Sequence, residues 1–145
     1  MPRRLNIITS QTPCLTVNRE AIYYRRLVYI AKANKPLSYK REKSCIAYIG
    51  MTRKGFRRIS ESVAWQAPYF LDTHGVKELQ YFVVTCTARR RLRSWKTLED
   101  ALLIRFCERF GEVPWLNSHG SGYRWDGELE YFTLASLDRV IDEYS

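Results

Sequence analysis

Five polar side chains lie in or beside apolar segments of the sequence, and their types suit one kind of chemistry. They are Tyr29, Tyr48, Arg58, Glu99 and Asn117. An arginine can stabilise the negative charge that develops when a phosphodiester bond is hydrolysed. A carboxylate can hold a divalent cation, and magnesium often takes one protein carboxylate while waters and phosphate oxygens complete its shell. The set therefore suggests phosphodiester hydrolysis.

The tyrosines and the asparagine fit the same chemistry as orienting groups. A tyrosine hydroxyl can position water or relay a proton, although its ordinary pKa of about 10 requires activation for proton transfer. An asparagine can orient a phosphate or a neighbouring side chain without adding charge. Structural explanations stay open for each residue: half-buried strand tyrosines, a solvated basic face for Arg58, a favourable charge near a helix N-terminus for Glu99, and a turn former for Asn117.

The spacing of cysteines and histidines argues against two other chemistries. The four cysteines contain no Cys-x-x-Cys pair, and the two histidines are not four residues apart. A zinc site needs clustered ligands, so this pattern argues against one. His74 and His119 also give no convincing Ser/His/Asp triad.

Positive charge is concentrated in the first part of the chain. Of 145 residues, 24 are Lys or Arg and 15 are Asp or Glu, which gives a formal net charge of +9. Residues 1–60 hold 14 basic and 2 acidic residues, whereas residues 61–145 hold 10 and 13. A basic half suggests a polyanionic partner, most simply nucleic acid. Anionic membranes, acidic proteins or a need for solubility would also account for it.

The hydropathy of the sequence limits the class of protein to which the chain can belong. No window approaches about 18 consecutive apolar residues, which rules out a transmembrane helix. The basic N-terminus is not followed by a long apolar run, so we expect a cytoplasmic protein without a secretory signal. With 46% hydrophobic residues, the chain has enough material for one domain with a core.

Apolar runs rich in branched and aromatic residues predict three strands. The first two lie at 27–33 and 45–52 and form an antiparallel hairpin, because the polar segment 34–44 reads as one long loop. The third strand is predicted at 77–88.

Helical spacing predicts the other elements. A helix with a basic face is expected over 53–66, followed by a loop around Pro68, and a long helix over 95–111 that starts near Thr97. The tail is predicted to hold a short strand at 129–134 and a helix over 136–144. The order β-β-α-β-α, with additional elements at both ends, indicates a compact α/β layer.

Two short segments make the sequence resemble the GIY-YIG nuclease superfamily. Leu27-Val28-Tyr29 stands where the family has Gly-Ile-Tyr, and Tyr48-Ile49-Gly50 matches Tyr-Ile-Gly. Arg58, Glu99 and Asn117 follow in the family's order, so the resemblance covers roughly 22–119. It implies a layered domain with a central three-stranded antiparallel sheet flanked by helices.

The resemblance also implies roles for these residues in a metal-dependent DNA endonuclease. Glu99 would hold one Mg²⁺ or Mn²⁺ ion, with Asp100 as the alternative ligand. Arg58 would clamp the scissile phosphate, Tyr29 or Tyr48 would position or activate water, and Asn117 would support the site. The sequence departs from the family at Leu27, which replaces the first glycine, and at Ser62, where relatives often have His or Tyr. A serine is a poor general base, so the role of general base would shift towards Tyr29 or to a residue that the sequence does not identify.

Double-stranded DNA is the expected partner, bound mainly through its phosphates. The residues expected to contact it are Arg53, Lys54, Arg57, Lys40, Arg41, Arg90, Arg91 and His119, with Arg3, Arg4 and Lys43 adding charge.

Three parts of the chain are expected, and two rival functions stay open. The parts are a basic N-terminal arm (1–21), the nuclease-like core (22–119) and an acidic C-terminal extension packed on it (120–145), through which a homodimer or a protein partner would bind. The rivals are a non-cleaving nucleic-acid-binding module and a toxin-like or accessory protein whose acidic tail binds a partner.

Overall fold

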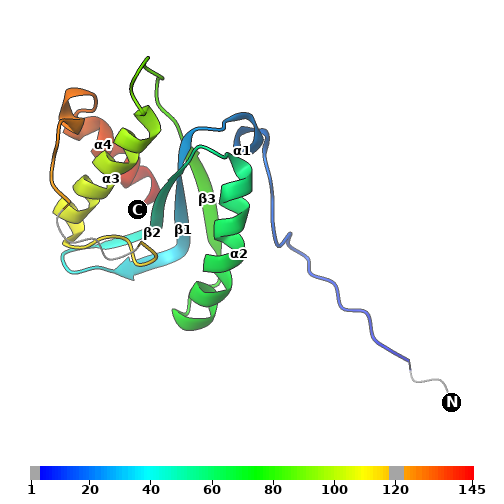
Figure 1. Cartoon of the computed structure of the whole chain (residues 1–145). Helices are drawn as coiled ribbons and strands as arrows, with labels where there is room; N and C mark the ends of the chain where they lie inside the picture. The colour runs from blue at the N-terminus through cyan, green and yellow to red at the C-terminus, as the bar shows by residue number, and fades with distance from the viewer. Residues whose placement is uncertain (1–3, 118–122) are drawn as a thin grey trace.

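A long strand in the middle of the fold pairs with both other strands. The computed structural model describes residues 4–117 and 123–145, and Figure 1 shows the sheet between its helices. Strand β1 (Leu27–Ser38) is antiparallel to β2 (Lys43–Thr52) on one side and to β3 (Leu79–Val84) on the other, in the order β2-β1-β3. The predicted α/β class and the three-stranded antiparallel sheet are confirmed.

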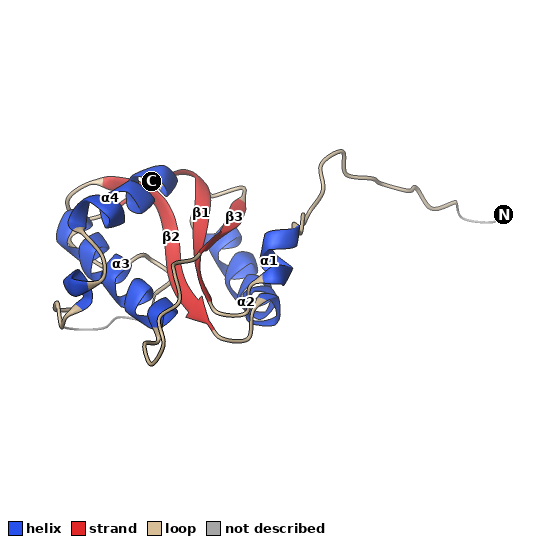
Figure 2. Cartoon of the chain, turned by 90° about the horizontal axis from the view of Figure 1, so that it is seen from above, coloured by secondary structure: helices blue, strands red, loops and turns tan. Residues whose placement is uncertain are grey.

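Helices cover both faces of this sheet. Figure 2 shows α3 and α4 on one side and α2 on the other, while residues before α1 extend away from the domain. The helices are α1 (Arg19–Tyr23), α2 (Phe56–Thr73), α3 (Ser94–Phe110), the short 3₁₀ helix η1 (Glu128–Glu130) and α4 (Leu134–Tyr144). None of the helices in the described part of the chain is long and apolar enough to span a membrane.

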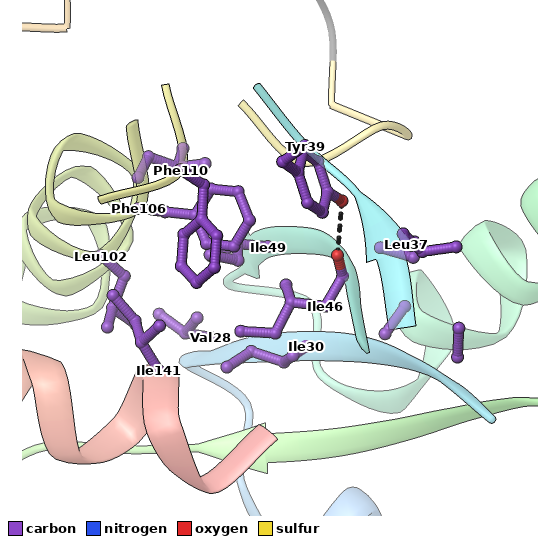
Figure 3. Packing of buried hydrophobic residues seen from close by; sticks show 14 of the residues in the cluster. Val28, Ile30, Leu37, Tyr39, Ile46, Ile49, Leu102, Phe106, Phe110 and Ile141 are labelled. Carbon is purple, nitrogen blue, oxygen red and sulfur yellow. Dashed lines mark hydrogen bonds between the residues drawn. The ribbon is translucent and has the colours of Figure 1, made fainter. Parts of the chain in front are cut away.

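The larger core cluster lies between the sheet and helices α3 and α4. Phe106 and Phe110 stack with ring centroids 4.3 Å apart, and the ring of Tyr39 meets both edge-on (Figure 3). The Tyr39 hydroxyl donates a hydrogen bond to the Ile46 carbonyl oxygen at 2.5 Å and accepts one from the Trp115 backbone N–H at 3.2 Å. The Tyr39 hydroxyl therefore has hydrogen-bond partners although it lies within the core.

A smaller cluster lies on the α2 side of the sheet. It consists of Leu27, Tyr29 and Ile59, with Tyr48 and Tyr81 packed against it. Side chains alternate between the two faces of a strand, so Val28 and Ile30 of β1 enter the larger core while Leu27 and Tyr29 face α2. This alternation brings the first predicted tyrosine to the α2 side.

The predicted loop at 34–44 is wrong in extent. Strand β1 continues to Ser38 and β2 begins at Lys43, so the turn is confined to 39–42. The polar residues after Ala33 belong to an exposed part of the strand, and the pairing resumes past an irregularity at Leu37, whose side chain is buried. Polarity there marks solvent exposure, not the end of the strand.

Helix α2 is longer than predicted. It runs through Pro68 to Thr73, although the sequence predicted an end at 66 and a loop. Proline removes one helical hydrogen bond. Pro68 lies on the exposed side, however, and Phe70 two residues later is fully buried. Burial of Phe70 holds the last turns in helical form.

In the C-terminal half, one predicted strand is wrong, and the helix predicted over 95–111 is confirmed with a shifted start. The segment 129–134 forms no strand: it holds the end of η1, and Thr133 caps α4 by accepting a hydrogen bond from the Ser136 N–H at 3.1 Å. Helix α3 begins at Ser94, three residues before the expected Thr97. Capping side chains such as Thr133 favour a helix start over strand pairing.

The acidic residues of the tail pair with α3. Arg105 donates two hydrogen bonds to Asp138, at 2.8 and 2.9 Å, and Arg109 pairs with Asp138 at 3.3 Å and with Asp142 at 2.7 Å. Leu137 and Ile141 of α4 are buried in the larger core. These contacts give the acidic charge of α4 a partner within the chain.

Candidate active site

Tyr29 and Tyr48 meet on the α2 side of the sheet because a glycine lies between them. Tyr29 is paired with Gly50 across β1 and β2. The Tyr48 ring lies over Gly50, where an added Cβ would come within 2.4 Å of the ring atom Cε1. The two tyrosine rings are 5.5 Å apart between centroids. Within the Tyr-Ile-Gly sequence, the glycine therefore leaves room for the ring of Tyr48.

Helix α2 reaches this pair through Ser62. The Tyr29 side chain is 1% exposed, and its hydroxyl shares a hydrogen bond of 2.7 Å with the Ser62 Oγ. One turn later, the buried Gln66 accepts a hydrogen bond of 3.3 Å from the Tyr81 hydroxyl. From the sequence, Ser62 was noted only as a poor general base at a position where relatives often have His or Tyr. Gln66 was not identified. The spacing of four between these polar residues on an otherwise apolar helix face was the available signal.

The pKa of the Tyr48 hydroxyl is affected by its burial and by several of the candidate residues. Burial raises its pKa, the neighbouring Tyr29 and Glu99 act in the same direction, and Arg58 lowers it. Burial, reinforced by Tyr29, also raises the pKa of Tyr81 to about 12. Tyr48 thus keeps its proton at neutral pH and acts as a hydrogen-bonding group close to both a cation and a carboxylate.

Arg58 lies in the first turn of α2. The helix begins after Gly55, whose φ of +64° is a left-handed conformation that favours glycine, and whose N–H donates to the Arg25 carbonyl at 2.9 Å. The Arg58 guanidinium is 3.5 Å from the Glu61 carboxylate, and its side chain is 52% exposed. An exposed ion pair of this kind is weak, so the guanidinium is available for an anionic ligand.

Glu99 reaches the same area from α3. Its side chain is only 14% exposed, and the ammonium of Lys96 lies 3.3 Å from it and 2.7 Å from Asp100. Burial raises the pKa of Glu99, while Lys96 and the Met51 backbone favour its charged form. Lys96 was missed from the sequence, although its position three residues before Glu99 on one helix predicts the contact.

The carboxylates fit a magnesium or manganese ion better than a zinc ion, which needs several protein ligands. Glu99 and Asp100 offer hard oxygen donors, and Mg²⁺ is commonly held by one or two carboxylates together with waters and phosphate oxygens. Across residues 4–117 and 123–145, no group of three or more His, Cys, Asp and Glu side chains could hold a metal ion. A cation at Glu99 would take over the charge neutralisation that Lys96 provides.

Asn117 acts on the backbone of β2. Its Nδ2 donates to the Ile49 carbonyl at 2.7 Å, and its Oδ1 accepts from the Ile49 N–H at 3.0 Å. The preceding Leu116 donates its N–H to the Ala47 carbonyl at 3.0 Å. Both polar ends of Asn117 are therefore engaged on the strand that carries Tyr48 and Gly50, which makes it a positioning residue.

The predicted DNA-contacting residues fall at two ends of the sheet. Four exposed ones lie at the end where Tyr29 and Tyr48 are found, in the turn before α2 (Arg53, Lys54) and in the loop between β3 and α3 (Arg90, Arg91). Lys40 and Arg41 lie in the β1–β2 turn at the other end. There the Arg41 guanidinium donates to the Glu108 carbonyl oxygen at 2.6 Å, at the C-terminal end of α3.

The other basic residues predicted to contact DNA are exposed where the structure describes them. Arg57 is exposed on the first turn of α2, 3.4 Å from Glu61. Arg4 and Lys43 are exposed, whereas Arg3 and His119 lie outside the described residues. The charged surface nearest the tyrosines is thus the one around the start of α2.

Comparison of the chain with protein-family models, with curated proteins and with solved structures gives no match.

Proposed function

We propose that this chain is a divalent-metal-dependent DNA endonuclease with a GIY-YIG-like arrangement. The observation that carries the proposal is the pairing of Tyr29 with Tyr48, whose ring centroids lie 5.5 Å apart, while Arg58 and Glu99 shift the pKa of Tyr48 in opposite directions. These four residues stand at the positions on which the sequence resembles that superfamily. Basic residues surround the same end of the sheet, as binding to a phosphate backbone requires.

Each residue has a role that its surroundings support. Arg58, released from Glu61, contacts the scissile phosphate and stabilises the charge that develops on it. Because its pKa is raised, Tyr48 orients the attacking water by hydrogen bonding and does not remove its proton. Tyr29, fixed by Ser62, supports the Tyr48 ring.

Glu99 is the residue that would hold the metal ion, with Asp100 as the alternative ligand. When bound, the ion polarises a phosphoryl oxygen and neutralises developing charge. Lys96 has to leave the carboxylate for this, and its 40% exposed side chain can turn into solvent. Asn117 keeps Tyr48 in place by fixing Ile49 next to it.

The test is nicking of supercoiled plasmid by the full chain with Mg²⁺ or Mn²⁺, against an EDTA control. Glu99→Gln is expected to lower the rate on the order of 100-fold or more, because a metal contributes several kcal/mol to such transition states. Asp100→Asn identifies the ligand if it has the larger effect, and Glu78→Gln, an exposed carboxylate before β3 at the other end of the sheet, serves as the matched control. Plasmid binding without nicking under every divalent metal would refute the endonuclease.

A non-cleaving nucleic-acid-binding module is the second candidate. It is favoured by Lys96, which already neutralises Glu99 and Asp100 as a permanent ion pair would. Under this alternative, Lys96→Met weakens nucleic-acid binding and produces no nicking. Under the endonuclease proposal, the same change lowers the concentration of Mg²⁺ needed for nicking, since the competing cation is gone.

A further inference from the structure

Helix α2 carries exposed aromatic residues beside the face that packs on the site. Arg58, Ser62, Trp65 and Tyr69 recur at spacings of four, three and four, so they share one face of the helix. Ser62 is the buried member of this row, and its bond to Tyr29 places the row beside the tyrosine pair, while the other three side chains are exposed. Trp65 is 75% exposed and Tyr69 is 61% exposed. The structure of the core does not require either ring.

The rings continue from α2 towards the loop beside β2. Tyr69 contacts the ring of His74 with centroids 6.1 Å apart, and His74 contacts Trp115 at 5.0 Å. His74 in turn stacks on the buried Phe70 at 4.7 Å, which holds it in place. Arg58 at one end and the aromatic rings at the other therefore form one surface, which we name the α2 strip: Arg58, Trp65, Tyr69, His74 and Trp115.

Charge near the α2 strip favours a polyanion as its occupant. Arg53, Lys54 and Arg57 are exposed next to Arg58 at the start of the helix. Among the described residues, the only carboxylate that pairs with any of these four is Glu61. Cationic and aromatic side chains on one surface are typical of proteins that hold a nucleic-acid strand, with phosphates on the charges and bases on the rings.

Spacing along the helix distinguishes an unpaired strand from a duplex. Trp65 and Tyr69 are four residues apart, a rise of about 6 Å along the helix axis. Bases stacked within a duplex follow each other at about 3.4 Å and have their faces covered by neighbours. Two successive bases can each seat on one ring only when they are unstacked. We infer that the α2 strip binds an unpaired segment of nucleic acid, its bases stacked on Trp65 and Tyr69 and its backbone directed to Arg58.

This inference rests on the proposed function for what happens at Arg58, and it names the substrate class as DNA with unpaired nucleotides beside the scissile phosphate. Binding is testable without cleavage. Fluorescence anisotropy in EDTA compares the full chain on a labelled single strand, on the matched duplex, and on an abasic strand of equal length that keeps only the phosphates and sugars.

Trp65→Ala is expected to weaken binding of the single strand on the order of 5- to 100-fold, with a smaller loss for Tyr69→Ala. Trp65→Phe should keep most of the affinity, because phenylalanine also offers a ring face. Binding of the abasic strand should stay unchanged in all of these variants. Leu134→Ala removes an exposed apolar side chain at the start of α4 and is the control, with no expected effect.

The inference is overturned if the Trp65→Ala/Tyr69→Ala double variant binds the single strand like the wild type, which would leave the strip to a protein partner. Equal losses on the normal and abasic strands would also overturn it. The endonuclease proposal fails separately: stacking that depends on Trp65 with no nicking refutes the enzyme alone, and nicking that needs Glu99 but neither ring refutes the inference alone.

Discussion

The side of the sheet covered by α3 and α4 differs from the side covered by α2 in how it uses polar and charged groups. Against α3 and α4, the core is built from stacked aromatic and aliphatic side chains, and the arginines Arg105 and Arg109 are paired with carboxylates of α4. Against α2, tyrosine hydroxyls are buried and bonded to helix side chains, while arginines at the start of α2 are exposed.

The comparison separates stability from chemistry. Apolar burial and partly buried ion pairs hold the fold on the α3 side, so changes there should unfold the protein. Polar groups on the α2 side contribute less to stability per residue. A net charge of +9 is thus divided between arginines engaged in the fold and basic residues available to a ligand.

The largest expected effect comes from removing a buried side chain from the core on the α3 side. Phe106→Ala removes a fully buried ring that contacts Phe110 and Tyr39, and it should lower the free energy of unfolding by about 3–5 kcal/mol. Urea denaturation measures the loss. Leu129→Ala, at an exposed position, should stay within about 0.5 kcal/mol of the wild type. A loss below about 1 kcal/mol for Phe106→Ala would contradict a core centred on α3.

A smaller effect is expected from the ion pairs of α4. Asp138→Asn should lower the free energy of unfolding at neutral pH by about 1–3 kcal/mol, since Arg105 loses its charged partner. The hydrogen bond from Arg105 lowers the pKa of Asp138 below its ordinary 3.8. A carboxyl whose pKa is lower in the folded than in the unfolded protein stabilises the fold at pH values above its unfolded pKa. This contribution to stability is lost as the pH falls through the folded pKa.

The pH dependence of the same variant sharpens that prediction. The difference in stability between wild type and Asp138→Asn should be full at neutral pH and shrink once the pH drops well below 3.8, where the wild-type carboxyl takes up a proton. Denaturation curves at both pH values measure it. A difference independent of pH would show that the charge of Asp138 does not stabilise α4.

The smallest effect is expected on the α2 side. Tyr29→Phe and Ser62→Ala should each cost about 1 kcal/mol of stability, and the double variant should cost little more than either, because both remove one hydrogen bond. A double-mutant cycle in urea measures the coupling. Additive losses would mean that Tyr29 and Ser62 do not act as a pair.

Much of the fold could be predicted because apolar runs mark strands directly. The three strands and two main helices lie where the sequence placed them, but their ends do not. Pro68 and the polar residues after Ala33 suggested ends, yet burial of Phe70 and Leu37 extends both elements. These local signals for the end of an element were overridden by contacts between residues that are distant in sequence.

The candidate site was predictable in type and only partly in geometry. Motif spacing identified Tyr29, Tyr48 and Gly50, but it could not show that the ring of Tyr48 lies over the glycine. It also could not show that Asn117 holds the backbone of Ile49, because that contact joins residues from distant segments. Lys40 and Arg41 were grouped with the other basic residues by charge alone, although the hairpin carries them to the far end of the sheet.

The middle of the outer edge of β2 is covered. Three alternate residues in its middle are already bonded: the Cys45 N–H donates to the carbonyl of Ser145 at 3.3 Å, the Ala47 carbonyl accepts from Leu116, and Ile49 is held by Asn117. A sheet edge with free backbone groups templates aggregation and edge-to-edge association. Ser145 and the loop at 114–117 therefore cover the middle of this edge, which leaves fewer free backbone groups to pair with strands of other copies.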